Sequence, residues 1–329
     1  MNKVINQSLE EQIFNVTDTT FEKVALSVFN YQYKHCLPYK KFCDLLGKTN
    51  PTCISEIPFL PVSFFKSEKI IAQGLTVEKT FKSSGTIGSV RSQHHVASLK
   101  LYKQSFYSTY ENSIGDPEDQ IIIALLPSYV EQGESSLLYM VDHLIENSAH
   151  QLSGYFLDQV SNLPKYVNEI KANHPQKKIV IIGVSYALLD LAEFEPDLSH
   201  VTIIETGGMK GRRKEMTKEQ LHETLERAFG VPVISSEYGM TELLSQAYSV
   251  AEQKFLAPNW MKVIIRDIND AFSYLPLNKT GGVNVIDLAN LYSCSFIATQ
   301  DLGRIEENGF KIVGRFDNSD IRGCNLLVN

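Results

Sequence analysis

The sequence predicts an α/β fold with a mostly parallel sheet, followed by a small antiparallel sheet or partial barrel. Between about residues 120 and 235, short apolar runs alternate with longer segments of helical periodicity. This alternation is typical of βαβ units whose parallel strands are buried on both faces. After about residue 255 the segments shorten, and Glu307-Asn308-Gly309 has the composition of a hairpin turn. We expect one compact unit with a helical cover at residues 1–55, an α/β core at 56–254 and a small β part with a short tail at 255–329.

The N-terminal part is predicted to hold helices around one extended connector. Thr19 and Thr20 can cap a helix, and the residues after them recur at helical spacing. Residues 58–65 contain two prolines, which disfavour helix in the residues before them. A further helix is expected over residues 96–113. The apolar faces of these two helices are Phe21, Val24, Ala25, Val28 and Phe29, and Leu99, Tyr102, Phe106 and Tyr110.

The middle of the chain is predicted to alternate strands with helices. Strands are expected at residues 121–127, 151–156, 178–183, 201–205 and 231–235. Helices are expected at residues 135–146, up to about 173, from 186, and at 217–229 with Thr217 as the cap. The final β part is expected to have strands at residues 261–267, 282–287, 295–299 and 310–314.

Composition excludes several classes of protein. A net charge of −7 without a basic domain argues against nucleic acid as a partner. The N-terminus lacks the apolar core of a signal peptide, and the most apolar run, residues 121–126, is too short to span a bilayer. The five cysteines are sparse and lack metal-site spacing, so we expect reduced thiols in a cytoplasmic protein.

A Ser/Gly stretch at residues 83–89 is the first candidate binding loop. Ser83, Ser84 and Thr86 offer small oxygen donors, and Gly85 and Gly88 free the backbone N–H groups. Such a loop suits the phosphates of a nucleotide. It is not a Walker A loop, and a simple flexible turn is the alternative. The adjacent histidines at 94–95 lack the helical spacing of a chelating pair, so we expect them on the surface.

Two further candidates follow predicted strands, at the edge where parallel sheets bind ligands. Gly207 and Gly208 permit close approach to a flat ligand such as a purine, and Lys210 adds charge suited to phosphate. The alternative is a solvated basic turn. The second segment offers, in order, a ring that can stack on a base, a glycine that permits a tight turn, a hydroxyl that can cap a helix or bind phosphate, and a carboxylate that can bind Mg²⁺. These residues are Tyr238, Gly239, Thr241 and Glu242.

The last candidates lie near the C-terminus. Asp301, expected at a strand end, can accept hydrogen bonds from both ribose hydroxyls. Arg315 can reach a phosphate or ribose oxygen. An aspartate turn and a surface arginine are the alternatives for each residue alone.

Together these segments resemble the motifs of adenylate-forming enzymes. Residues 83–88 look like their phosphate loop, with Ile87 where Thr is usual, and residues 238–242 resemble their Tyr-Gly-x-Thr-Glu signature. Residues 301–304 and 309–315 resemble their Asp-Leu-Gly and Gly-Arg segments. The resemblance runs from about Pro58 to the C-terminus. Within the superfamily the chain is most similar to the acyl-protein synthetase of bacterial luminescence, a long-chain fatty acid–luciferin-component ligase, with phenylacetate–CoA ligases as relatives.

The resemblance implies a large core of mostly parallel sheets flanked by helices, whose part at residues 56–254 binds the nucleotide. It implies that a carboxylic acid, fatty by analogy, reacts with Mg²⁺ and ATP to give acyl-AMP and pyrophosphate. Most such enzymes continue into a lid domain with a catalytic lysine, whereas this chain stops 14 residues after Arg315. Lys210 is our candidate for the positive charge at the α-phosphate, in place of the lid lysine. Cys324 matches the cysteine that accepts the acyl group in the acyl-protein synthetase.

The resemblance also implies that the acyl group passes to a partner protein: an acyl reductase, an acyltransferase or an acyl carrier protein. Two other interpretations stay open. One is direct ligation to CoA or to the pantetheine of a carrier protein. The other is a catalytically silent nucleotide-binding subunit.

Overall fold

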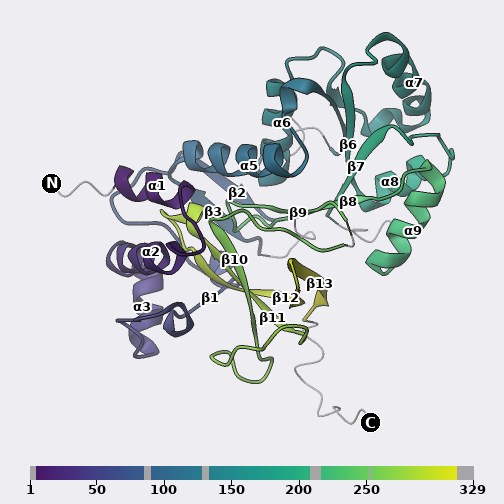
Figure 1. Cartoon of the computed structure of the whole chain (residues 1–329). Coiled ribbons are helices and arrows are strands. Elements are labelled where there is room, and N and C mark those ends of the chain that lie inside the picture. The colour runs from purple at the N-terminus through teal and green to yellow at the C-terminus, as the bar shows by residue number, and fades with distance from the viewer. Residues whose placement is uncertain (1–4, 85–89, 128–132, 208–215, 252, 317–329) are drawn as a thin grey trace, which may run out of the picture. The chain divides into compact units, whose positions relative to one another are not determined.

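The computed structural model describes residues 5–84, 90–127, 133–207, 216–251 and 253–316 (Figure 1). The chain forms two compact units. One unit joins Met1–Gly74 to Asn259–Asn329, and the other is Leu75–Pro258. No helix among the described ranges is both long and apolar enough to cross a membrane.

A six-stranded sheet forms the centre of the unit Leu75–Pro258, in the order β5-β4-β6-β7-β8-β9. The first five of these strands pair in parallel, and β9 is antiparallel to β8. Every residue of β4 is buried, as expected for a parallel strand covered on both faces. The strands are β4 (Gln120–Leu125), β5 (Gly154–Tyr155), β6 (Lys178–Val184), β7 (Val201–Thr206), β8 (Ser235–Tyr238) and β9 (Ala247–Ser249).

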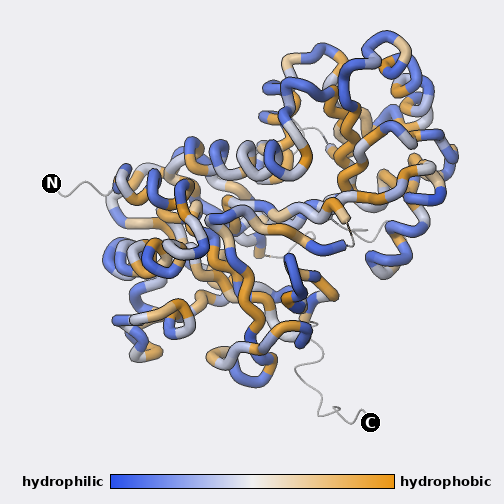
Figure 2. The backbone as a smooth tube through the Cα atoms, viewed as in Figure 1, coloured by the Kyte–Doolittle hydropathy of each residue, from blue (hydrophilic) through white to orange (hydrophobic). Residues whose placement is uncertain are grey.

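Helices pack on this sheet, and a separate two-stranded hairpin pairs β2 (Lys79–Lys82) with β3 (Gln93–Val96). Helix α6 contacts β4, and α8 contacts both β6 and β7. The helices are α5 (Leu99–Ser113), α6 (Ser136–Ser148), α7 (Leu163–Asn173), α8 (Ser185–Ala192) and α9 (Lys218–Phe229). Figure 2 shows apolar positions concentrated along the central strands of the sheet, where these helices cover them.

A mostly antiparallel sheet forms the core of the other unit. β10 (Met261–Arg266), β11 (Gly281–Asp287), β12 (Phe296–Glu306) and β13 (Gly309–Arg315) are antiparallel neighbours, and β1 (Leu60–Pro61) pairs in parallel with β12. The N-terminal helices are α1 (Gln7–Phe14), α2 (Phe21–His35) and α3 (Leu37–Leu45), and α4 (Phe64–Ser67) follows β1.

The N-terminal helices belong to the same unit as this antiparallel sheet, because their buried side chains contact its strands. The ring of Phe296 on β12 lies 6.3 Å from that of Phe29 and 6.1 Å from that of Tyr39, between centroids. Gln32 on α2 is fully buried and donates to the carbonyls of Asn290 and Leu291. Residues 60–61, expected within the nucleotide-binding core, pair with β12 instead.

The expected α/β class is observed, and most strands and helices lie within a few residues of their predicted positions. Strands β1, β2, β3 and β9 were not expected, and two expected strands differ in their bounds in ways that bear on the site. β8 begins at Ser235 rather than at residue 231, because Pro232 lacks the N–H that a ladder needs and the N–H of Ile234 donates to Glu226. β12 continues to Glu306 through a register shift after Leu302, so Asp301 lies within the strand and not at its end.

Candidate nucleotide-binding site

The carboxyl ends of β6, β7 and β8 lie side by side and carry the candidate binding segments. Val184 pairs with Thr206, and Glu205 pairs with Ser236, so the three strands end at a common edge. Gly207 follows β7 with φ of +74°, a conformation that residues with a Cβ rarely adopt. Ligands bind at this edge of parallel sheets.

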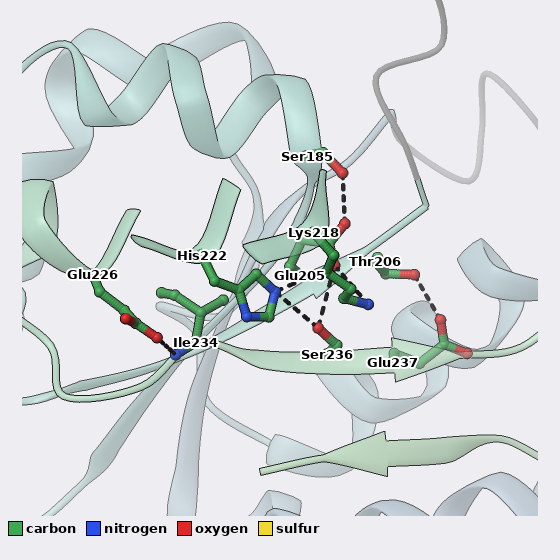
Figure 3. Close-up of polar contacts among 9 residues, drawn as sticks. All are labelled: Ser185, Glu205, Thr206, Lys218, His222, Glu226, Ile234, Ser236 and Glu237. Carbon is green, nitrogen blue, oxygen red and sulfur yellow. Dashed lines mark hydrogen bonds and ion pairs between the residues drawn. The ribbon is translucent and has the colours of Figure 1, made fainter. Parts of the chain in front are cut away.

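A buried carboxylate, Glu205, joins these three strands and helix α9 (Figure 3). Its Oε1 accepts a hydrogen bond of 2.5 Å from Ser185 Oγ, and its Oε2 accepts one of 3.3 Å from Ser236 Oγ. Lys218 Nζ lies 3.5 Å and His222 Nε2 3.9 Å from Oε2. We call Ser185, Glu205, Lys218, His222 and Ser236 the Glu205 cluster.

The charges of the cluster keep Glu205 ionised. Burial opposes the ionised form, but the nearby ring of His222 and the charge of Lys218 outweigh it, so the pKa of Glu205 is lowered. Helix α9 supplies both partners. A reciprocal capping box between Thr217 and Gln220 fixes the start of the helix, and the spacing of four residues puts Lys218 and His222 on one face.

Tyr238 is held in place by the same helix. Lys218 Nζ lies 4.7 Å from the centre of the Phe255 ring, and that ring lies 5.7 Å from the ring of Tyr238. Tyr238 is only 8% exposed. The candidate stacking residue is therefore packed against Phe255, which Lys218 contacts in turn.

Glu237 is a second carboxyl group at this edge, and it is half-buried. Its Oε2 accepts a hydrogen bond of 2.6 Å from Thr206 Oγ1. Burial, reinforced by the negative charge of Glu205, raises its pKa to about 7. A Cβ at position 239 would overlap Glu237 Oε1, so a larger residue there would displace this carboxylate. Sequence reasoning missed Glu237 and the whole Glu205 cluster.

The hairpin of β2 and β3 frames the Ser/Gly stretch. Ser83 N donates to Ser92 O at 3.1 Å, and Ser92 N donates to Ser83 Oγ at 3.0 Å. Lys82 Nζ forms an ion pair of 2.6 Å with Glu134, whose pKa is lowered by that hydrogen bond. Arg91 lies 3.5 Å from the same carboxylate and also donates to Ser83 O. These contacts were not expected from the sequence.

The surface position expected for the adjacent histidines is wrong for His94. His94 is fully buried, and its Nδ1 lies 2.8 Å from Thr241 O. A carbonyl oxygen only accepts, so Nδ1 carries the proton. His95, on the other face of the hairpin, pairs with Thr80 Oγ1 at 2.9 Å.

Thr241 does not cap a helix, because turns follow it in the described chain. Glu242, next to it, is 6% exposed. No group of three or more His, Cys, Asp or Glu side chains in the described part of the chain could hold a metal. A single carboxylate still fits Mg²⁺, which keeps several waters and takes its other ligands from substrate phosphates.

Asp301 and Arg315 belong to the other unit and meet there. Arg315 Nε donates to Asp301 Oδ1 at 2.9 Å, across directly paired positions of β12 and β13. Asp301 is 4% exposed. Arg266 lies beside them. It donates to Thr299 O at 2.7 Å, to Asn284 Oδ1 at 2.7 Å and to Val283 O at 2.8 Å.

The remaining candidates are only partly covered by the structure. Ser83, Ser84, Gly207, Tyr238, Gly239, Thr241 and Glu242 all belong to the unit Leu75–Pro258. Gly85, Thr86, Gly88, Gly208, Lys210 and Cys324 lie outside the described residues. Of the described cysteines, Cys36, Cys43 and Cys294 are buried. Burial raises their pKa values, to about 11 for Cys36 and about 12 for Cys43, so these thiols stay protonated at neutral pH.

Comparison with known families identifies the chain. A family model described as acyl-protein synthetase, LuxE, matches residues 7–329. The chain belongs to this family. The family resemblance predicted from the motifs is therefore confirmed. A long-chain-fatty-acid–luciferin-component ligase of Photorhabdus luminescens is 36% identical over 69 residues, which are 20% of this chain and 60% of that protein.

Solved structures of adenylate-forming enzymes share the fold. ATP-bound MatB from Rhodopseudomonas palustris has a TM-score of 0.53 at 18% identity, over 72% of this chain and 47% of that one. 2-Hydroxyisobutyryl-CoA ligase with its 2-HIB-AMP has a TM-score of 0.64 at 12% identity, over 96% of this chain and 73% of that one. The predicted α/β core of adenylate-forming enzymes is thus confirmed. The chain spans about half the length of the MatB chain that it matches.

Proposed function

We propose that this member of the acyl-protein synthetase family activates a carboxylic acid with ATP and passes the acyl group to a thiol. What supports the proposal is that Gly207, Tyr238 and Glu242 gather at one end of a parallel sheet in a chain that the family model matches almost completely. The named relative acts on long-chain fatty acids, so a fatty acid is the first substrate to test.

In the first step a carboxylate oxygen attacks the α-phosphorus of ATP, the α–β anhydride bond breaks, and pyrophosphate leaves. This reaction needs alignment and charge neutralisation more than covalent help from the protein. Residues 83–88 would hold the β- and γ-phosphates, Gly207 and Gly208 would flank adenine, and Tyr238 would stack on it. Gly239 would permit the tight turn, and the hydroxyl of Thr241 would donate a hydrogen bond to a phosphate oxygen.

The family resemblance gives roles to the other candidate groups as well. Glu242 would hold the Mg²⁺ that neutralises the phosphate charge. Asp301 would bind the ribose hydroxyls, and Arg315 would bind a ribose or phosphate oxygen. Lys210 would supply the positive charge at the α-phosphate. Because Arg315 already donates to Asp301, ribose would share or replace this partner.

In the second step a thiolate attacks the acyl carbonyl, the C–O bond to AMP breaks, and the thiol proton goes to solvent. We propose Cys324 as this thiol, followed by transfer to a partner such as an acyl reductase, an acyltransferase or an acyl carrier protein. CoA or a carrier pantetheine would be the acceptor in the alternative reaction. Free thiols at Cys36, Cys43, Cys53 and Cys294 fit a cytoplasmic enzyme.

The test has two stages. ATP–pyrophosphate exchange across a panel of carboxylic acids should respond to at least one acid, with long chains tried first. Self-acylation, measured as a hydroxylamine-labile adduct, should then be lost in Cys324→Ser while exchange persists. Cys53→Ser is the matched control, because Cys53 is the described thiol that is not buried. No exchange with any acid would overturn the activity, and an adduct that survives in Cys324→Ser would overturn the acceptor.

A further inference from the structure

A partly buried hydrogen bond connects the hairpin that flanks the Ser/Gly stretch to the turn that carries Glu242. His94 lies on β3, directly opposite Phe81 of β2, and both side chains are fully buried. Its Nδ1 donates to the carbonyl of Thr241, which is 147 positions away in the sequence. The Ser/Gly stretch lies between β2 and β3 in the chain, and Glu242 follows Thr241 directly.

We propose that His94 is a positioning residue that fixes the turn of Glu242 relative to the phosphate-loop hairpin. The inference rests on the proposed function, since it assigns His94 to the nucleotide site. The peptide group between Thr241 and Glu242 is planar, so holding its oxygen sets the plane in which the Cα of Glu242 lies. A hydrogen bond to that oxygen therefore fixes the backbone position from which the carboxylate that would take Mg²⁺ extends.

The hairpin itself offers the comparison that separates positioning from packing. His95 is the neighbour of His94, but its Nδ1 pairs with Thr80 Oγ1 on the opposite strand of the same hairpin. That contact stays within the hairpin, whereas the contact of His94 leaves it. A change at His95 should therefore leave nucleotide use intact, and a change at His94 should not.

The decisive variants differ in where they place an N–H donor. In His94→Asn the side-chain amide can occupy the place of Nδ1, whereas in His94→Gln the amide lies one bond further out. We expect His94→Asn to keep kcat/KM for ATP in pyrophosphate exchange within about threefold of wild type. Loss of a group that orients a metal ligand costs about 10–100-fold in metal affinity or activity, and we expect that loss in His94→Gln, with a raised Mg²⁺ requirement.

Thermal unfolding of each full-length variant controls for folding, and His95→Gln serves as the matched control. Equal activity of the Asn and Gln variants would overturn the inference, as would losses that simply follow the melting temperature. If wild-type protein shows no exchange with any acid, the proposed function fails instead. The same variants then test His94 by the Mg²⁺-dependent shift in melting temperature that ATP causes, with the same expected order: wild type and Asn above Gln.

Discussion

Each unit of the molecule holds a buried carboxylate on a β-strand, but the two carboxylates are neutralised in opposite ways. Glu205 is surrounded by the other four members of the Glu205 cluster, and its cationic partner Lys218 is only 28% exposed. Asp301 also lies within a strand, yet its partner Arg315 has 76% of its side chain exposed. An enclosed carboxylate fixes its surroundings. A carboxylate with an exposed partner can exchange that partner for a ligand.

The largest effect should come from removing the enclosed carboxylate. Glu205→Ala leaves Lys218 without its anion and the hydroxyl of Ser185 without its acceptor, while Ser236 keeps His222 as a partner. Breaking a buried ion pair in this way costs about 3–5 kcal/mol, and we expect a loss of that size in the free energy of unfolding, measured in urea. Glu205→Gln keeps an acceptor for the hydroxyls and should lose less. A loss below about 1 kcal/mol in the alanine variant would contradict an enclosed, structural role.

Arg266 is the part of the Asp301 region that resembles the Glu205 cluster. It gives three hydrogen bonds to β11 and β12, and its side chain lies so close to Gly282 that a Cβ there would overlap the guanidinium. Burial lowers the pKa of Arg266, and the charge of Asp301 opposes the shift. Arg266→Met should cost about 2–4 kcal/mol of unfolding free energy, because buried acceptors lose their donors. Arg266→Lys keeps a charge without the planar fork, and full rescue by lysine would show that geometry does not matter.

Glu237 offers a pH test that separates it from Glu205. Its pKa rises from 4.5 to about 7 on folding, so the folded state keeps a proton that the unfolded state loses. The free energy of unfolding should therefore fall as pH rises through this window and stay level above it. The lowered pKa of Glu205 has the opposite sign: its contribution is full above the ordinary carboxyl pKa and is lost as pH falls below it.

Glu237→Gln removes the group that titrates and keeps a hydrogen-bond acceptor for Thr206. At pH 5 and at pH 8 we would measure the free energy of unfolding of both proteins in urea. We expect the difference between variant and wild type to shift by about 1–3 kcal/mol in favour of the variant from pH 5 to pH 8. The same fall in stability from pH 5 to pH 8 in both proteins would rule out Glu237 as its source.

Local patterns were enough to predict much of the fold. The apolar run at residues 121–126 predicted the buried strand β4, and Thr217 caps α9 as expected, within a capping box that also includes Gln220. The motifs around residues 83, 238 and 301 led to the family that the model match confirms. These signals lie within a few consecutive residues, where spacing alone is informative.

The contacts that shape the candidate site could not be predicted in this way. Glu205 meets Ser185 and Ser236 at separations of 20 and 31 residues, and His94 meets Thr241 at 147. One sequence carries no record of which distant residues pair. The usable signal was a charged residue at the end of an apolar strand, since such residues are almost never buried without a partner. Glu205 in Val-Thr-Ile-Ile-Glu fits that description.

The smallest effect on stability should come from the exposed partner of Asp301. The side chain of Arg315 is mostly exposed, and Arg266 stays beside the buried Asp301, so Arg315→Ala should lower the free energy of unfolding by only about 0–1 kcal/mol. If Arg315 exchanges Asp301 for a ribose or phosphate oxygen, the same variant should raise KM for ATP in pyrophosphate exchange about 10-fold or more, the loss expected for a hydrogen bond to a charged group.

Arg304→Ala is the control for this variant, because Arg304 also forms an ion pair on β12, partly exposed, with Glu306 at 2.7 Å, but has no proposed ligand. An unchanged KM for ATP in Arg315→Ala would mean that the pair is only a surface contact. A large loss of stability instead would mean that Asp301, like Glu205, needs its cation to fold. Either result would remove the contrast between an enclosed carboxylate that holds the structure and an accessible one that binds.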